Sequence, residues 1–340
     1  MENQPGFLAM NNNAVFGANW LALRLKEILG TTEVSNLIRL SGGANRETWS
    51  FEAHTKEKQH SLIMQIDRDG MDRLNGTCER ESRILHIAKL NGVPVPTVIA
   101  SGFSEGSGSR SFSITEKMQG ETIARKILRD SQWKNARENL IHDMAKALAA
   151  IHRIDRSQFE GIELSDVRDP LSSLESIYEA LNDPHPTFDF AFRWLQANQP
   201  KISESTFVHG DFRLGNLLID TSGLNAVLDW EIAQFGDPIQ DLGWMCVRAW
   251  RFGSDQRVAG IGSYDQLIES YVQESGQDVS TATLLWWEIF GTLRWGIICL
   301  QMGGDFRKGR TNSLEIAAIG RRVAENEYDL LQAIGEKLNE

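Results

Sequence analysis

The sequence predicts an α+β protein with a small strand-rich lobe, residues 1–118, and a larger, mainly helical lobe, residues 119–340. A chain of 340 residues is too long for one small core and suits two lobes. Short extended segments surround one helical segment, 77–90, in the first lobe, whereas apolar residues at helical spacing dominate the second. Within the second lobe, residues 207–241 stand apart as a strand-and-loop insert.

The first lobe is expected to begin with a helix at 18–29 that ends at a glycine. Residues 36–53 are typical of a strand, a glycine turn and a second strand, and SLIMQI at 61–66 forms another short strand. After the 77–90 helix, the prolines of VPVP favour extended chain. A further strand at 111–120 leads into the connection between the lobes.

The second lobe is expected to consist of long helical segments around the 207–241 insert. In that insert, LLID and AVLD are predicted strands joined by the turn TSG. The expected helical segments are 134–152, 171–197, 265–273, 281–302 and 313–337.

The composition is that of an ordinary globular protein, with 41% hydrophobic and 24% charged residues. The net charge of −11 argues against a nucleic acid partner, because phosphate backbones attract basic surfaces. No apolar run approaches the roughly 20 residues that span a bilayer, so no membrane partner is expected. Nothing in the sequence specifies an oligomeric state.

The three cysteines, Cys78, Cys246 and Cys299, are far apart and form no C-x-x-C pair. The sequence therefore signals neither a zinc site nor a redox motif, and the odd count does not suggest a disulfide framework. The N-terminal residues lack the basic and apolar regions of a secretory signal. A reduced, cytoplasmic setting is the expectation.

Acidic and amide side chains recur between apolar runs in the 207–241 insert. A buried carboxylate without a partner is costly, so a metal, a hydrogen bond or a cation is expected beside each one. His209, Asp211 and Asn216 follow the H-x-D-x-x-x-x-N spacing of a phosphoryl-transfer loop. Such a reaction needs a carboxylate that orients the attacking hydroxyl, oxygen ligands for Mg²⁺, and groups that neutralise the phosphates.

Asp211 is predicted to be the catalytic base, while His209 supports its loop. Asn216 and Asp229 are predicted oxygen ligands of Mg²⁺, with Asp229 at the end of the second short strand. Arg213 is expected either to contact the transferring phosphate or to form a salt bridge with a neighbouring acid.

The motifs of this insert resemble those of the aminoglycoside phosphotransferase-like (APH) family, in the protein-kinase-like superfamily. The branch most similar in appearance contains the kinase-like domains of certain acyl-CoA dehydrogenase fusion proteins. The resemblance covers most of the chain, with the segments LSGGANRETW, RESRILHIA, VPVP, ITEKMQGETI, FVHGDFRLGNLLID, AVLDWEIAQFGDPIQDLGW and WWEIFGTLRWGIICL. It implies a bilobal protein-kinase-like fold, ATP or GTP as phosphate donor, and a small-molecule hydroxyl as acceptor. It also implies that Asp237 and Asp241 hold the loop.

The resemblance also assigns nucleotide-binding positions in the first lobe. A glycine-rich turn between two strands would cover the phosphates, because glycines allow close approach and leave N–H groups free for anions. Backbone groups of Glu116 and Met118, where the lobes connect, would pair with the edge of the base. The turn residues are Ser41, Gly42, Gly43 and Asn45.

One nucleotide-site position departs from the family pattern. Glu81 matches the glutamate that pairs with a strand lysine in kinases, but the aligned strand position holds Gln65. Glutamine can donate a hydrogen bond to phosphate but carries no charge. Arg46 or Arg68 could compensate, or the protein could be weakly active.

Two questions of function stay open at this stage. A small-molecule kinase is the favoured interpretation, and a non-catalytic nucleotide-binding module is the alternative; the absence of D-F-G and A-P-E sequences disfavours a protein kinase. The acceptor could be anionic, as Arg294 suggests, or cationic, as the net charge suggests. The tryptophans near Arg294 could stack on an acceptor or form part of the core: Trp286, Trp287 and Trp295.

Overall fold

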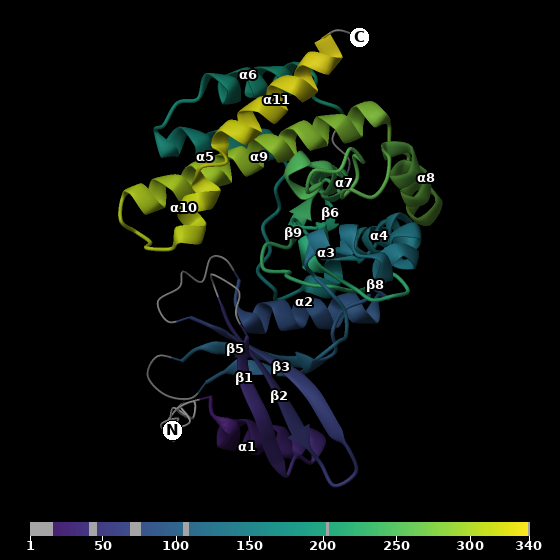
Figure 1. The fold of residues 1–340 in the computed structure, drawn as a ribbon, viewed down its shortest axis with the longest axis vertical. Coiled ribbons are helices and arrows are strands. Elements are labelled where there is room, and N and C mark those ends of the chain that lie inside the picture. Colours follow the sequence, from purple (N-terminus) through teal and green to yellow (C-terminus); the bar gives the residue numbers. More distant parts are fainter. Residues whose placement is uncertain (1–15, 41–45, 69–75, 105–108, 202–203, 339–340) are drawn as a thin grey trace, which may run out of the picture. The chain divides into compact units, whose positions relative to one another are not determined.

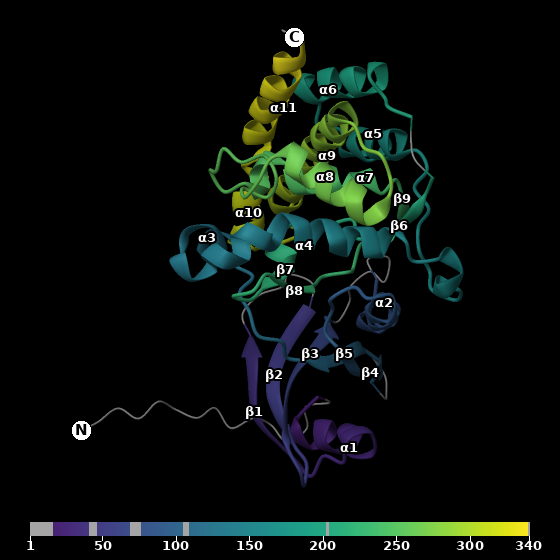
Figure 2. The same ribbon diagram turned by 90° about the vertical axis from the view of Figure 1, so that its right-hand side faces the viewer.

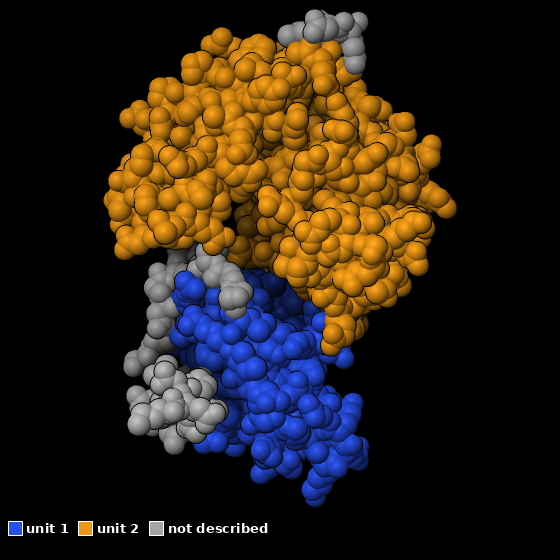
Figure 3. Space-filling model, in the orientation of Figure 1, with its two compact units in different colours: residues 1–86, 96–118 blue, residues 87–95, 119–340 orange. Residues whose placement is uncertain are grey.

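The protein has the predicted α+β architecture, with an antiparallel sheet in its first part and helices in its second (Figure 1). The chain divides into two compact units, which Figure 3 colours separately: unit 1 is residues 1–86 and 96–118, and unit 2 is residues 87–95 and 119–340. The computed structural model describes residues 16–40, 46–68, 76–104, 109–201 and 204–338.

Unit 1 is built on a five-stranded sheet with all neighbours antiparallel, in the order β1-β2-β3-β5-β4. Helix α1 (Ala18–Leu29) packs on one face of this sheet through Leu21 and Leu25, and Gly30 ends it in the left-handed conformation. Figure 2 shows α1 against the strands. The remaining elements of this part are β1 (Glu33–Leu40), β2 (Arg46–His54), β3 (Gln59–Asp67), α2 (Cys78–Leu90), β4 (Val98–Phe103) and β5 (Ser111–Glu116).

The alternation of side chains along β3 fixes what each face of the sheet carries. Leu62, Met64 and Ile66 are buried in the core under α1. Because successive side chains of a strand point to opposite faces, Gln65 belongs to the other face. There it lies in register with Thr48 of β2 and Ser113 of β5.

Unit 2 is organised around the long helix α9 (Thr281–Arg307), which contacts most of its other helices. Trp286 and Trp287 of α9 are only 1% exposed, so these two are core side chains. None of the described helices is both long and apolar enough to cross a membrane. The other helices are α3 (Ala124–Arg129), α4 (Lys134–His152), α5 (Pro170–Leu181), α6 (Pro186–Ala197), α7 (Ile239–Cys246), α8 (Tyr264–Ser275), α10 (Leu314–Gly320) and α11 (Val323–Leu338).

Two segments that were expected to be continuously helical are each divided into two helices. In 171–197, Asn182 adopts the left-handed conformation with φ of 51° and ends α5, and Pro186 begins α6. Proline lacks the N–H group that a helix interior requires, so it is found in the first turn. In 313–337, a short break separates α10 from α11.

Four short strands frame the predicted catalytic loop. They form two antiparallel pairs, β6 with β9 and β7 with β8. The β7–β8 pair corresponds to the expected strands LLID and AVLD, while the β6–β9 pair was not predicted. The strands are β6 (Thr206–Val208), β7 (Leu217–Ile219), β8 (Leu224–Val227) and β9 (Gln234–Gly236).

The three cysteines are free thiols, and all of them are buried. Burial raises the pKa of Cys78 and Cys246 well above the usual thiol value, and that of Cys299 to about 12. A thiol with a raised pKa stays protonated, so these side chains are unreactive structural groups.

Candidate active site

The carboxylate of Asp211 lies in the loop between β6 and β7 and accepts three side-chain hydrogen bonds. Its Oδ1 accepts from Trp244 Nε1 at 2.6 Å and from Arg213 Nε at 3.1 Å. Its Oδ2 accepts from Asn216 Nδ2 at 2.6 Å. A side chain with three directional donors is held in one orientation, as a catalytic group must be.

The backbone of this loop is fixed by the fully buried carboxylate of Asp241 on α7. Its two oxygens accept the N–H groups of His209 and Gly210, each at 2.8 Å. Burial alone would raise the pKa of Asp241, but the hydrogen bonds from the His152 ring and from the N–H group of His209 bring that pKa below its ordinary value. The expected role of Asp241 as a loop anchor is therefore observed.

Glycine is required at position 210 of the loop. Its φ is +82°, and a Cβ built there would lie 2.9 Å from the carbonyl oxygen of Ile232. Both the backbone conformation and the space exclude a side chain. The close approach allows the N–H group of Gly210 to reach Asp241 and its carbonyl to accept a hydrogen bond from Arg294 Nη1 at 3.0 Å.

The buried ring of His209 connects Asp211 with the segment that follows β8. Its Nδ1 accepts the N–H group of Asp211 at 3.2 Å, so Nε2 carries the ring proton and donates to the carbonyl of Leu228 at 3.0 Å. Both ring nitrogens are occupied by the backbone, which agrees with the predicted supporting role of His209.

A backbone hydrogen bond at Leu228 links the segments that carry Asn216 and Asp229, the predicted metal ligands. The N–H group of Leu228 donates to the carbonyl of Asn216 at 2.9 Å, and Asp229 follows directly with φ of +64°. The amide nitrogen of Asn216 makes two hydrogen bonds to Asp211, while its Oδ1 accepts none from the described residues. An amide oxygen and a carboxylate are oxygen ligands of the kind that suits Mg²⁺.

No group of three or more His, Cys, Asp or Glu side chains that could hold a metal ion occurs in the described part of the chain. A nucleotide-bound Mg²⁺ does not need such a group, because phosphate oxygens and water supply most of its six ligands. The pair Asn216 and Asp229 fits that mode of binding.

Tryptophans and arginines surround the loop, and most of them are not predicted there by the sequence. The guanidinium of Arg213 lies 4.8 Å from the ring centroid of Trp250, and that of Arg294 lies 4.7 Å from Trp244. Arg294 is largely desolvated, which lowers its pKa. Trp244 stands three residues after Asp241 on α7, and this helical spacing was the signal that could have found it.

In unit 1, Glu81 pairs with a cation on β2, whereas the family pattern places that cation on β3. Arg46 Nη1 pairs with Glu81 of α2, and Arg46 Nε lies 3.6 Å from Asp67. Both partners of the main pair are buried, at 7% and 5% exposure. Arg46, one of the two compensating arginines considered from the sequence, contacts Glu81. Gln65 on β3 takes no part in this pair.

The remaining predicted nucleotide positions divide into described and undescribed residues. Ser41, Gly42, Gly43 and Asn45 lie outside the described residues. Glu116 is tied to Thr97 by a backbone bond of 2.9 Å and a side-chain bond of 2.8 Å. Among the described residues, the N–H group of Met118 makes no backbone hydrogen bond.

A five-stranded antiparallel unit, a helical unit, and a loop with H-x-D-x-x-x-x-N spacing define a kinase-like phosphotransferase. The chain belongs to the phosphotransferase enzyme family, APH, whose sequence profile matches residues 36–275. The resemblance seen in the sequence is thereby confirmed.

Curated relatives include proteins of very different length. The chain is 29% identical over 233 residues to acyl-CoA dehydrogenase family member 10 of Mus musculus, which covers 66% of this chain and 21% of that protein. It is 26% identical over 221 residues to family member 11 of Rattus norvegicus, covering 59% and 28%. The chain thus matches about a quarter of the length of these relatives. Hygromycin-B 4-O-kinase of Escherichia coli is 24% identical over 225 residues, covering 60% of each protein.

Solved structures show the same fold at low identity. An aminoglycoside phosphotransferase-like protein of Ralstonia eutropha has a TM-score of 0.73 at 22% identity, covering 93% of this chain and 97% of that chain. A thermostable mutant of APH(4)-Ia, solved with AMP-PNP and hygromycin B, has a TM-score of 0.59 at 18% identity, covering 92% and 98%. Below 25% identity these likenesses concern the fold alone.

Proposed function

We propose that the protein transfers the γ-phosphate of ATP or GTP to a hydroxyl group of a small molecule, with Asp211 as the base. The observation that carries the proposal is the hydrogen bonding of Asp211 to Trp244, Arg213 and Asn216 within a kinase-type loop. Membership in a family of phosphotransferases supports the reaction class.

The hydrogen bonds of Asp211 indicate which of its oxygens receives the proton. A carboxylate oxygen offers two lone pairs, and Oδ1 already accepts two hydrogen bonds, whereas Oδ2 accepts one. The acceptor hydroxyl would therefore donate to Oδ2 as its oxygen approaches the γ-phosphorus. A new P–O bond forms, the bond from the γ-phosphorus to the bridging oxygen breaks, and the nucleoside diphosphate leaves.

The charges of the phosphates require positive groups and metal ligands. Asn216 Oδ1 and the carboxylate of Asp229 would hold Mg²⁺, which supplies charge neutralisation at the phosphates when bound. Arg213 forms a salt bridge with Asp211. In our proposal its Nη groups contact the transferring phosphate while Nε continues to hold Asp211.

The nucleotide would bind to unit 1 and the acceptor to unit 2. The Ser41–Asn45 turn is proposed to cover the phosphates, with Gln65 donating a hydrogen bond to them. Backbone groups of Glu116 and Met118 would pair with the base. The role of Glu81 in this proposal is to hold Arg46 in place through their buried ion pair.

The deciding experiment is a transfer assay with the purified protein, Mg²⁺, ATP or GTP, and a panel of hydroxylated compounds that includes hygromycin B, amino alcohols, sugars and hydroxy acids. Phosphorylated products are identified by mass spectrometry. We expect Asp211→Asn to lower kcat about 100- to 10,000-fold, the range of general-base contributions. Asp265→Asn, an exposed carboxylate on α8, is the matched control and should keep full activity.

The alternative is a nucleotide-binding module without transfer, and the same assay distinguishes it. Nucleotide binding without turnover on any acceptor, under every Mg²⁺ concentration, would contradict the kinase and support the module. Retention of kcat within tenfold in Asp211→Asn would contradict the assigned base even if transfer occurs.

A further inference from the structure

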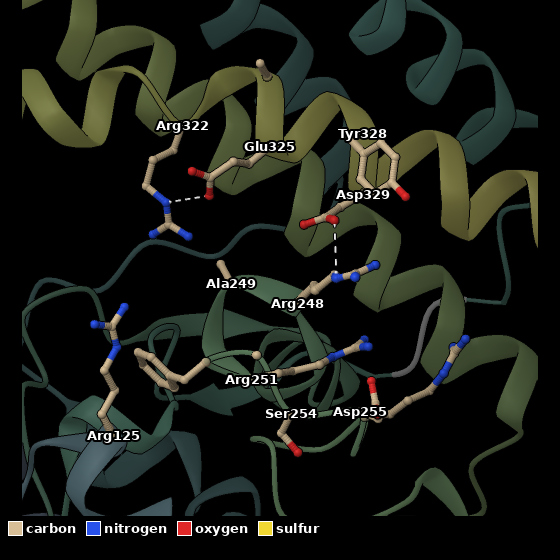
Figure 4. Close-up of a pocket in the computed structure, with 14 residues that line it drawn as sticks. Arg125, Arg248, Ala249, Arg251, Ser254, Asp255, Arg322, Glu325, Tyr328 and Asp329 are labelled. Atoms are coloured by element: carbon tan, nitrogen blue, oxygen red, sulfur yellow. Dashed lines mark hydrogen bonds and ion pairs between the residues drawn. The ribbon is translucent and has the colours of Figure 1, made fainter.

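A pocket of about 1160 Å³ lies in unit 2 between α3, the segment after α7 and α11 (Figure 4). Five arginines and three acidic residues line it, so its charge is net positive in a protein whose net charge is −11. The arginines are Arg125, Arg248, Arg251, Arg257 and Arg322, and the acids are Asp255, Glu325 and Asp329. We call this the arginine pocket. It was not predicted from the sequence.

Two of the five arginines form ion pairs or hydrogen bonds with other residues of the chain. Arg251 is buried, donates twice to the carbonyl of Cys246, and pairs with Glu288 at 2.7 Å. Arg257 pairs with Glu336 at 2.7 Å and lies against a tyrosine ring. These two arginines stabilise the wall of the pocket.

The other three arginines retain unused donors. Arg125 is exposed and has no hydrogen bond or ion pair with any described residue. Arg248 and Arg322 use only Nε, with Asp329 at 3.5 Å and Glu325 at 2.9 Å, so their Nη groups donate to nothing in the described chain. In Figure 4 the guanidinium groups of Arg125 and Arg322 point toward one another. Planar guanidinium groups that converge are suited to carboxylate or phosphate oxygens.

Side-chain contacts connect the arginine pocket with the loop of Asp211. Arg322 lies 6.0 Å from the ring of Trp295, Trp295 lies 4.9 Å from Trp250, and Trp250 lies 4.8 Å from Arg213. Arg213 in turn holds Asp211. Trp250 is also preceded directly by Arg248 and Ala249, which line the pocket. A ligand in the pocket therefore lies beside the tryptophans that border the candidate base.

We propose that the arginine pocket binds an oxyanion of the acceptor, either a carboxylate or a phosphate group, through the facing guanidinium groups of Arg125 and Arg322. This inference rests on the proposed function. The acceptor is then an acidic hydroxy compound with several atoms between its hydroxyl and its anionic group, since it must reach past Trp250. A cationic group at the same place would be repelled by these two side chains.

The test measures how fast each arginine of the full chain reacts with phenylglyoxal, resolved by peptide mass spectrometry. The probes are inorganic phosphate and tricarballylate, each at constant ionic strength. At about 10 mM, tenfold above a Kd of 1 mM, occupancy of about nine-tenths should slow the reaction at Arg125 about tenfold. Arg129 lies on the same helix, is exposed and does not line the pocket, so its rate should not change. Equal rates at Arg125 with and without both probes would overturn the proposal.

The two probes distinguish the two sources of the oxyanion. Protection by tricarballylate alone indicates a carboxylate on the acceptor, and protection by phosphate alone indicates a phosphorylated acceptor. Arg322→Gln should raise the half-protecting concentration at Arg125 about tenfold, because one charge-assisted hydrogen-bonding group is lost. The neighbouring exposed Arg321→Gln should leave that concentration unchanged, and equal effects of the two variants would contradict a specific site.

This measurement also separates the two proposals, since protection requires no catalysis. Protection without phosphate transfer to any acceptor would overturn the kinase but leave an oxyanion site. Transfer without protection would overturn the pocket but leave the kinase. If the protein transfers phosphate and the arginine pocket binds the acceptor, Arg322→Gln should raise the KM for the acceptor about tenfold. The KM for ATP should remain unchanged.

Discussion

The two units hold their predicted site residues in different ways. In unit 2, Asp211 and Asn216 stand at the positions that the motif spacing predicts, and they bond directly to each other. In unit 1, Glu81 is present, but its cation comes from β2 rather than from β3. Arg46 at the start of β2 lies in register with Asp67 at the end of β3, so a long side chain from either strand can reach α2. The residues of the loop motif must therefore stand at fixed sequence positions, whereas the cation that pairs with Glu81 can come from either of two neighbouring strands.

The largest effect is expected at the anchor of the loop in unit 2. Asp241→Asn leaves buried donors from His209, Gly210 and His152 without a full set of acceptors, and should lower the free energy of unfolding by about 4 kcal/mol. Urea unfolding at pH 7 measures the loss. The exposed Asp265→Asn serves as control and should change it by less than about 0.5 kcal/mol.

The loss of unfolding free energy in Asp241→Asn should depend on pH, because the pKa of Asp241 is lowered in the folded protein. A carboxylate whose pKa is lower in the folded state stabilises the fold above its unfolded pKa of about 4, and this contribution is lost as the pH falls further. The difference between Asp241→Asn and the wild type should therefore be constant from pH 7 to about 5 and shrink below about 4. A difference that grows on acidification would contradict the assignment.

A somewhat smaller effect is expected from breaking the pair in unit 1. Arg46→Gln leaves the buried carboxylate of Glu81 without this cation and should cost about 3 kcal/mol of unfolding free energy. The double variant with Glu81→Gln should be less destabilised than the sum of the single variants, by about 1 to 3 kcal/mol. Additive costs in urea unfolding would show that the two side chains are not coupled. Arg39→Gln on the exposed part of β1 is the control.

The smallest effect is expected at the position that departs from the family pattern. Gln65→Lys adds the cation that kinases place on this strand, but Glu81 is already paired with Arg46. We expect kcat/KM for ATP to change by no more than about twofold, because a lysine that Glu81 does not orient would only replace the hydrogen bond proposed from Gln65 to the phosphates. A rise of tenfold or more in steady-state assays would mean that Arg46 does not replace the β3 cation and that unit 1 lacks a functional cation.

The sequence was sufficient for the fold class, for most helices and for the residues of the loop, because each depends on local spacing. It was insufficient for partners that meet only in the folded chain. Trp244 and Asp211 are 33 residues apart, and Arg46 and Glu81 are 35 apart. The three arginines of the pocket that retain unused donors belong to separate elements of the chain, so no local sequence pattern predicts the pocket. The division of 171–197 into two helices was visible in Pro186, which cannot occupy a helix interior.

The buried thiols have a practical consequence for labelling chemistry. Cys78, Cys246 and Cys299 are the complete set of cysteines, and all three are protonated and enclosed. Maleimide reagents attack exposed thiolates, so the natural protein should remain unmodified. Cysteines introduced at the exposed positions Lys58 in unit 1 and Gln196 in unit 2 would then carry a pair of spin labels without removal of any native residue. The distance distribution between those labels, recorded before and after nucleotide addition, would report directly on domain motion.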